Sequence, residues 1–133
     1  MKKHGILNSH ISKVLADLGH TDTIVIADVG LPIPEGVKKI DLALTHGSPG
    51  FEETVNAIAA DMEVEKAVIA EEMSSDNPAA FHYIQNKFNG ISIQQCSHEE
   101  FKQLTKKAKA VIRTGEAKPY ANIILQAGVY FGS

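Results

Sequence analysis

Short apolar runs recur along this chain and predict the strands of a buried sheet. The run from Thr23 to Ala27 is almost unbroken and rich in β-branched residues, as expected for a strand covered on both faces. Later segments are less uniform: residues 39–44 alternate at first and are apolar at their end, residues 64–70 end in the apolar Ala67-Val68-Ile69-Ala70, and residues 91–94 are short. We therefore predict further strands at residues 39–44, 64–70, 91–94, 110–112 and 122–126.

Between most of these runs, apolar residues recur every three or four positions, which is the spacing of one helix face. This spacing predicts helices at residues 9–18, 51–61, 78–89 and 98–108. Capping residues or prolines mark their starts, namely Asn8 or Ser9, Ser48-Pro49, Asn77-Pro78, and Ser97 with Glu100 as a capping box. The stretch from Glu71 to Asp76 is predicted to be an acidic loop.

Strands that alternate with helices favour an α/β fold. We predict a three-layer α/β/α sandwich with a mainly parallel sheet of about six strands. The last strand follows a short connection, so it is expected to run antiparallel to its predecessor or to leave for a neighbouring subunit. No repeat or linker divides the chain, which predicts a single domain over residues 1–131. Residues 132–133 are interpreted as an addition to the natural chain.

Composition narrows the class of protein. The chain has 133 residues, of which 44% are hydrophobic and 22% charged, which is typical of a soluble globular domain. A net charge of -3 argues against nucleic-acid binding. Cys96 is the only cysteine, so there is no internal disulfide, and no two histidines have the i, i+4 spacing of a helical metal site. We expect no metal, no membrane contact and a cytoplasmic location.

The stretch around the first strand carries the first candidate chemistry. Gly19 can end a helix and present His20 at a chain reversal, and Asp28 lies at the carboxyl end of the strand, where parallel sheets bind ligands. A straight strand of five residues, at roughly 3.3 Å each, separates these two side chains by about 15 Å or more. They can therefore meet only through a sharp reversal or across a subunit interface. Alternatively, His20 is a surface residue at a helix end.

Two further groups of polar residues are candidates. His98 falls in the first turn of a predicted helix, where the helix dipole favours a neutral imidazole, and Lys102 follows one turn later. Tyr120 and Asn122 share one face at strand spacing and suit sugar hydroxyls, although such residues are also common in turns.

His46 is a weaker candidate. It precedes the segment Gly47-Ser48-Pro49-Gly50, whose backbone N–H groups could hold an anion at a helix start. The segment lacks the lysine of a phosphate-binding loop and the spacing of a dinucleotide-binding loop. An ordinary turn is the alternative interpretation of these residues.

Taken together, several segments resemble the D-ribose pyranase and fucose mutarotase family. The resemblance covers essentially the whole chain and includes Met1–Asn8, Leu18–Asp22, Ala27–Pro32, Thr45–Gly47 and Pro119–Asn122. It implies a cofactor-free isomerase that interconverts the β-pyranose and β-furanose forms of D-ribose. It also implies a homodecamer with its sites at subunit interfaces, which would resolve the separation of His20 and Asp28.

The same resemblance implies the roles of individual residues. His20 corresponds to the proton-transferring histidine of the family. The sugar-binding positions correspond to Asp28, His98, Tyr120 and Asn122, and to Ala121 through its backbone groups. The second proton-transfer partner stays open between His98, Tyr120 and water.

The implied reaction agrees with the residues available. Exchange between a six- and a five-membered sugar ring requires proton transfer to and from oxygen atoms, without redox chemistry, a metal or a covalent nucleophile. A histidine that titrates near neutral pH suits both directions. Two other classes stay open, a non-catalytic ribose-binding accessory of ribose uptake and a ring-forming structural module without a ligand.

Overall fold

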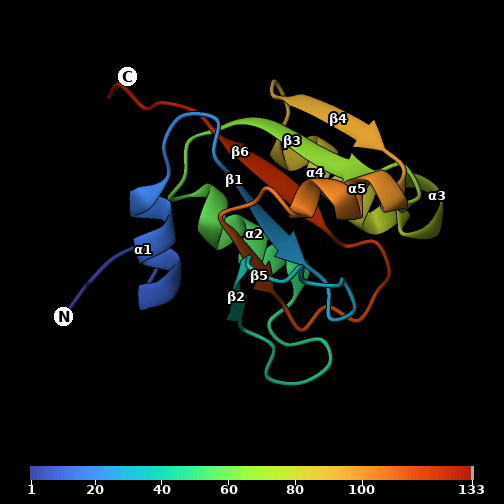
Figure 1. The fold of residues 1–133 in the computed structure, drawn as a ribbon, viewed down its shortest axis with the longest axis horizontal. Coiled ribbons are helices and arrows are strands. Elements are labelled where there is room, and N and C mark those ends of the chain that lie inside the picture. Colours follow the sequence, from blue (N-terminus) through green and yellow to red (C-terminus); the bar gives the residue numbers. More distant parts are fainter. Residues whose placement is uncertain (133) are drawn as a thin grey trace.

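The computed structural model describes residues 1–132, which form an α/β sandwich (Figure 1). The expectation for residues 132–133 extends to residue 133, which lies outside this range. Within residues 1–132 the helices are α1 (Ser9–Asp17), α2 (Phe51–Ala59), α3 (Met73–Asp76), α4 (Pro78–Lys87) and α5 (His98–Thr105). The strands are β1 (Thr23–Ala27), β2 (Lys38–Asp41), β3 (Val64–Ala70), β4 (Ser92–Cys96), β5 (Ala110–Arg113) and β6 (Ile123–Ala127).

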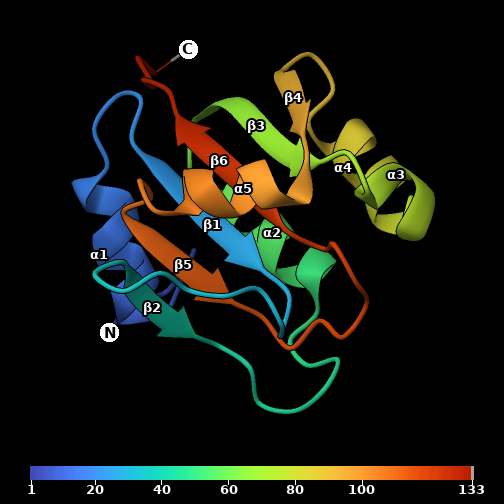
Figure 2. The ribbon, with the colours of Figure 1, turned by 45° about the vertical axis from the view of Figure 1, so that its right-hand side comes forward.

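The described strands form one sheet in the order β2-β5-β1-β6-β3-β4. β6 pairs antiparallel with β1 and β3, whereas the other neighbouring strands pair in parallel. Figure 2 shows the arrow of β6 pointing against that of β1. The sheet is therefore mixed, although mainly parallel as predicted. The last strand runs antiparallel to β5, but it lies between β1 and β3 and not beside its predecessor.

Alternation along the strands divides the core into two layers. Ile24 and Ile26 of β1 belong to a core cluster with side chains from α1, α2 and α4, whereas Val25 and Ala27 face a second cluster with α5. Leu31 and partly buried residues of the loop that follows β1 also cover this second face. Figure 1 shows α5 on the near side of the sheet, with α2 and α4 behind it. The predicted three-layer arrangement is confirmed.

Three local predictions need correction. Gly50 is the N-cap of α2, whereas Ser48 closes a tight turn by donating its N–H to the carbonyl oxygen of Thr45 over 3.0 Å. The predicted acidic loop contains α3, because Met73 is fully buried and anchors a helical turn in the core. β2 ends at Asp41, whose carboxylate accepts the N–H of Ala43 at 3.0 Å and turns the chain away from the sheet.

The edge strand β2 is joined to β5 by an ion pair between Asp41 and Arg113 that has two hydrogen bonds. Nε and Nη2 of Arg113 donate to the two carboxylate oxygens of Asp41 at 3.0 and 2.7 Å. These contacts lower the pKa of Asp41 below its ordinary value of 3.8, so the pair stabilises the fold above that pH and is lost as pH falls through the folded pKa.

We therefore expect Asp41→Asn to lower the melting temperature at neutral pH and to have a smaller effect in acid. Thermal unfolding of wild type and variant, from neutral pH down to acid below the folded pKa of Asp41, measures the difference. An equal gap at every pH would contradict the assignment of this stabilisation to the charge of Asp41.

Candidate functional site

Asp28 directly follows β1, and its carboxylate holds the loop that comes next. Oδ1 accepts the backbone N–H groups of Gly30 and Leu31, each at 2.9 Å. Asn122 donates its Nδ2 to Oδ2 of Asp28 at 3.2 Å and accepts the backbone N–H of Asp28 on Oδ1 at 2.8 Å. The two contacts of Asn122 use different atoms of its amide group, so the orientation of the amide is fixed. The Asp28 carboxylate that it contacts is held in place as well.

The carboxylate of Asp28 is largely removed from water. The residue is 9% exposed, and burial raises the pKa of Asp28 above its ordinary value, although the hydrogen bonds and the nearby His98 act in the opposite direction. In such surroundings a hydroxyl group that donates to an ionised carboxylate makes a strong, directional hydrogen bond. Asp28 is therefore suited to bind a sugar hydroxyl.

His98 is the first residue of α5, as predicted. Its backbone N–H lies 3.0 and 3.1 Å from the carboxylate oxygens of Glu72, while Ser97 caps the helix through the N–H of Glu100. Its ring meets the ring of Tyr120 edge-on, with centroids 5.1 Å apart. Nδ1 of His98 is buried and has no hydrogen-bond partner among residues 1–132. An unpaired polar atom of this kind marks a site that a ligand can complete.

Tyr120 lies in the left-handed region of backbone space, with φ of 59°. A side chain in this region costs energy and persists only where its surroundings hold it. The carbonyl oxygen of Tyr120 accepts the N–H of Asn122 at 2.9 Å, and that of Pro119 accepts Nδ2 of Asn77 at 2.9 Å. The strand spacing predicted for Tyr120 and Asn122 does not apply, because β6 begins at Ile123, yet both residues reach the site.

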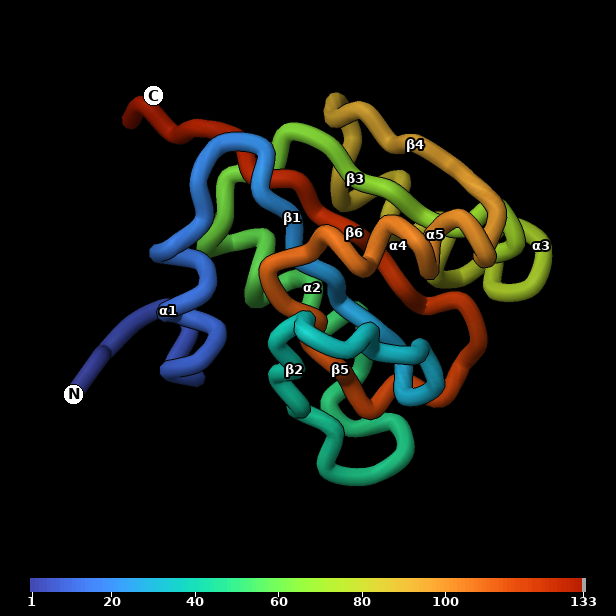
Figure 3. The backbone as a smooth tube through the Cα atoms, in the orientation of Figure 1, coloured from blue at the N-terminus to red at the C-terminus, as the bar shows by residue number. Residues whose placement is uncertain are grey.

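These side chains surround a cavity of about 330 Å³ at the carboxyl end of β1. Its lining combines the loop after β1, the start of α5 and the segment before β6, with Asp28, Val29, Gly30, Leu31, His98, Ala117, Pro119 and Tyr120. Three predicted site residues therefore share one cavity, and Asn122 supports Asp28 from behind. The tube in Figure 3 shows the segment between β5 and β6 running past the end of β1, where Val29 donates its N–H to the carbonyl oxygen of Glu116.

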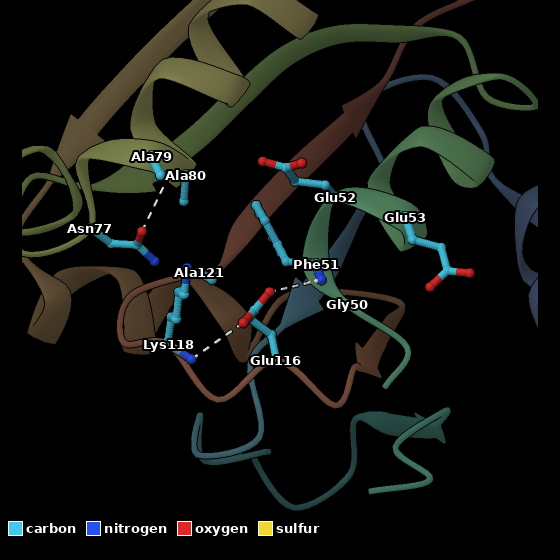
Figure 4. A pocket seen from close by; sticks show the side chains of 10 residues that line it. All are labelled: Gly50, Phe51, Glu52, Glu53, Asn77, Ala79, Ala80, Glu116, Lys118 and Ala121. Atoms are coloured by element: carbon cyan, nitrogen blue, oxygen red, sulfur yellow. Dashed lines mark hydrogen bonds between the residues drawn. The ribbon is translucent and has the colours of Figure 1, made fainter. Parts of the chain in front are cut away.

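A second cavity of about 290 Å³ is lined by the same segment and the starts of α2 and α4 (Figure 4). Ala121 lines this second cavity, whereas Asp28, His98 and Tyr120 line the first. Glu116 accepts the N–H of Phe51 on Oε1 at 3.2 Å and that of Lys118 on Oε2 at 3.4 Å. Glu116 and Asn77 therefore anchor the site segment to the helix layer, a role that sequence reasoning missed for both residues.

Besides Ala121 and Asn122, three further predicted candidates are absent from the first cavity lining, and they do not line the second cavity either. His20 is exposed before β1, at the opposite end of this strand from Asp28, and its Nε2 lies 2.9 Å from Oε2 of Glu65. Lys102 pairs with Glu99 at 2.8 Å, and His46 is exposed in the turn before α2. The structure thus brings Asp28, His98, Tyr120 and Asn122 together, but not these three.

Residues 1–132 contain no group of three or more His, Cys, Asp or Glu side chains arranged to hold a metal ion. In the same range, no helix is both long enough and apolar enough to cross a membrane.

Comparison with known proteins identifies the family. The family model described as "RbsD / FucU transport protein family" matches residues 1–130. The D-ribose pyranases of Bacillus subtilis (strain 168) and Bacillus licheniformis are 60% and 63% identical over 131 residues, which is 98% of this chain and 100% of each relative. The structure of Bacillus subtilis RbsD complexed with D-ribose has a TM-score of 0.96 at 60% identity, covering 98% of this chain and 100% of that one. A fucose mutarotase in complex with L-fucose, from Streptococcus pneumoniae, has a TM-score of 0.83 at 28% identity, covering 97% of this chain and 99% of the other. This chain belongs to the RbsD / FucU family.

Proposed function

We propose that this chain catalyses the D-ribose pyranase reaction, interconverting the β-pyranose and β-furanose forms of D-ribose without a cofactor. The observation that carries the proposal is the match, over 98% of the chain, to a ribose-bound RbsD at 60% identity and a TM-score of 0.96. The cavity beside Asp28 supports it, because a buried carboxylate, an imidazole and a phenol are suited to bind several hydroxyl groups of one small sugar.

Ring exchange opens a hemiacetal and closes it through another hydroxyl group. Opening requires a proton for the ring oxygen and removal of the proton from the anomeric hydroxyl. In this proposal Asp28 holds hydroxyl groups of the sugar, while Tyr120 and His98 form the wall beside it. His20 transfers the proton, and its partner in the second transfer is His98, Tyr120 or water.

The position of His20 requires a second copy of the chain. β1 separates His20 from Asp28 by its full five residues, at about 3.3 Å each. For both side chains to act on one sugar, His20 must enter from a neighbouring subunit, and the homodecamer implied by the family resemblance would supply it. Mass in solution tests this: we expect several times the mass of one chain, whereas a monomer would contradict a shared site.

Exchange NMR on D-ribose at equilibrium tests the proposed activity. Magnetisation transfer between the pyranose and furanose signals is measured with and without the protein, and we expect faster exchange with it. Unchanged exchange at a protein concentration that binds ribose would contradict the pyranase proposal and favour the non-catalytic accessory of ribose uptake.

Asp28→Asn is expected to weaken ribose binding by about 10- to 100-fold, the loss that follows when a charged hydrogen-bond partner becomes neutral. The new amide also meets Nδ2 of Asn122 with its own donor, and Asn122 cannot turn because its Oδ1 accepts the backbone N–H of residue 28. Calorimetric titration with D-ribose measures the loss, and an unchanged affinity would contradict a sugar contact at Asp28.

The same variant reports on the buried charge in the sugar-free protein. Because burial raises the pKa of Asp28, the stability it contributes is full below the unfolded value of 3.8 and is lost as pH rises through the folded value. Asparagine does not titrate. We therefore expect the free energy of unfolding of wild type, relative to that of Asp28→Asn, to fall as pH rises from the unfolded pKa of 3.8 through the folded pKa of Asp28. Urea unfolding of both proteins at several pH values measures this difference.

A further inference from the structure

The surroundings of His20 contain a built hydrogen-bond network that the proposed reaction has not yet used. Nε2 of His20 lies 2.9 Å from Oε2 of Glu65, and Oε1 of Glu65 accepts Nε2 of Gln126 at 2.7 Å. The three side chains come from the loop before β1, from β3 and from β6, so residues distant in sequence hold one imidazole.

The backbone at Glu65 is shaped to present its side chain. The pairing of β3 with β6 shifts between Val64 and Lys66, which pair with Ala127 and Gln126, so Glu65 is an extra residue in the ladder. An extra residue of this kind forms a β-bulge, which redirects a side chain and is frequent next to active sites.

The backbone around His20 is fixed as firmly. Thr21 has φ of 76°, a rare conformation for a β-branched residue. Its N–H donates to the carbonyl oxygen of Ala127 at 2.9 Å, and the N–H of Ala127 donates to that of Asp22 at 2.8 Å. Asp22 also accepts the N–H of Gly19 on its side chain at 2.8 Å. Strained backbone held by several hydrogen bonds is typical of functional positions.

We propose that Glu65 is a positioning residue for His20, and that it holds the Nε2–H tautomer so that Nδ1 exchanges protons with the sugar. The inference rests on the proposed pyranase function. A carboxylate can only accept, so the neutral imidazole donates from Nε2 and leaves the lone pair of Nδ1 free. The contacts with Gln126 and His20 lower the pKa of Glu65, which keeps its carboxylate ionised in this role.

The proton balance of the step is simple. The neutral ring takes the proton of the anomeric hydroxyl on Nδ1 and becomes an imidazolium, while the second partner protonates the ring oxygen as its bond to the anomeric carbon breaks. Closure through another hydroxyl returns both protons. Throughout, Nε2 keeps its proton and its hydrogen bond to Glu65.

Two substitutions at Glu65 separate positioning from charge. Glu65→Ala removes the acceptor, so we expect at least a tenfold lower kcat for ring exchange with an unchanged ribose affinity. Glu65→Gln keeps an acceptor oxygen for His20, and Gln126 can rotate its amide to accept from the new NH₂ group. We therefore expect Glu65→Gln to retain most of the activity.

The tautomer itself is observed by ¹⁵N NMR of the histidine rings at alkaline pH, where imidazole side chains are neutral. The His20 signals are identified by their absence from His20→Ala. We expect the Nε2–H form in wild type and Glu65→Gln, and a mixture in Glu65→Ala. Glu63→Ala is the matched control, because Glu63 is an exposed carboxylate two residues away with no side-chain hydrogen bond or ion pair among residues 1–132.

A Glu65→Ala protein with wild-type kcat and tautomer would overturn the proposal. Loss of activity in Glu65→Gln with the tautomer retained would also overturn it, because charge and not orientation would then be the cause. Failure of the pyranase proposal gives a different result: wild type would show no exchange, while the ring spectra would still report whether Glu65 selects the tautomer.

Discussion

Replacing His20 by alanine is expected to slow pyranose–furanose exchange by about 10²- to 10⁴-fold, the usual contribution of a positioned acid–base group. Ribose binding is expected to persist, because the cavity lined by Asp28 and Tyr120 lies at the other end of β1 and keeps all its contacts. The fold should persist as well, since the side chain of His20 is 56% exposed. Exchange NMR and calorimetric titration on the same preparation measure both effects.

His82→Ala is the control for this experiment, because His82 is an exposed histidine on α4, outside the residues that line the proposed site. A His20→Ala protein that exchanges ribose as fast as wild type would remove His20 from the mechanism. If His20→Ala bound no ribose, His20 would instead be needed to form the site, and the assignment of binding to the Asp28 cavity alone would be wrong.

The second large effect is expected at Gly115, where even one methyl group has no space. A Cβ atom there would meet the carbonyl oxygen of Ser48, and would lie 2.6 Å from both the carbonyl carbon of Ser48 and the carbonyl oxygen of Thr45. These are backbone atoms, so the turn or the site segment must move. Overpacking of this kind costs about 1–3 kcal/mol, occasionally more. We expect Gly115→Ala to lower the free energy of unfolding, measured in urea, by about 1 kcal/mol or more.

The displacement should also reach the proposed ribose site. Gly115 donates its N–H to Pro49 at 2.8 Å, and the next residue, Glu116, holds the N–H groups of Phe51 and Lys118. We therefore expect weaker ribose binding as well. Gly50→Ala is the control, because a Cβ at Gly50 comes no closer than 3.8 Å to its neighbours. Equal stability of the two variants would contradict the steric explanation.

Strands with a strong local pattern could be predicted from the sequence to the residue. Thr23–Ala27 and Val64–Ala70 have the predicted bounds, because each ends in four consecutive apolar residues that the sheet buries. The sequence predicts β6 as a strand, but it does not predict the position of this strand in the sheet. Its insertion between β1 and β3 depends on pairing with strands far away in sequence, which local periodicity does not encode.

The location of a candidate residue could be predicted where its place in a secondary-structure element indicated it. Asp28 at a strand end and His98 at a helix start are examples. Glu72, Asn77 and Glu116 were missed as parts of the site, because they act on backbone groups from distant segments. Asn77 was recognised as a helix cap from its Asn-Pro sequence, yet the same side chain also holds Pro119. No local signal shows such a second contact.

The antiparallel central strand has a consequence for how the molecule is assembled. Without β6, the sheet is two separate pieces, β2-β5-β1 and β3-β4, since β6 alone pairs with both β1 and β3 among the described strands. β6 is also the last strand among residues 1–132, so during synthesis it becomes available only after the strands of both pieces. Asn122, which fixes the carboxylate of Asp28, directly precedes it. Completion of the sheet and organisation of the proposed sugar site therefore occur together. Asp28 and Asn122 are 94 residues apart in the sequence, and contacts of such long range form slowly.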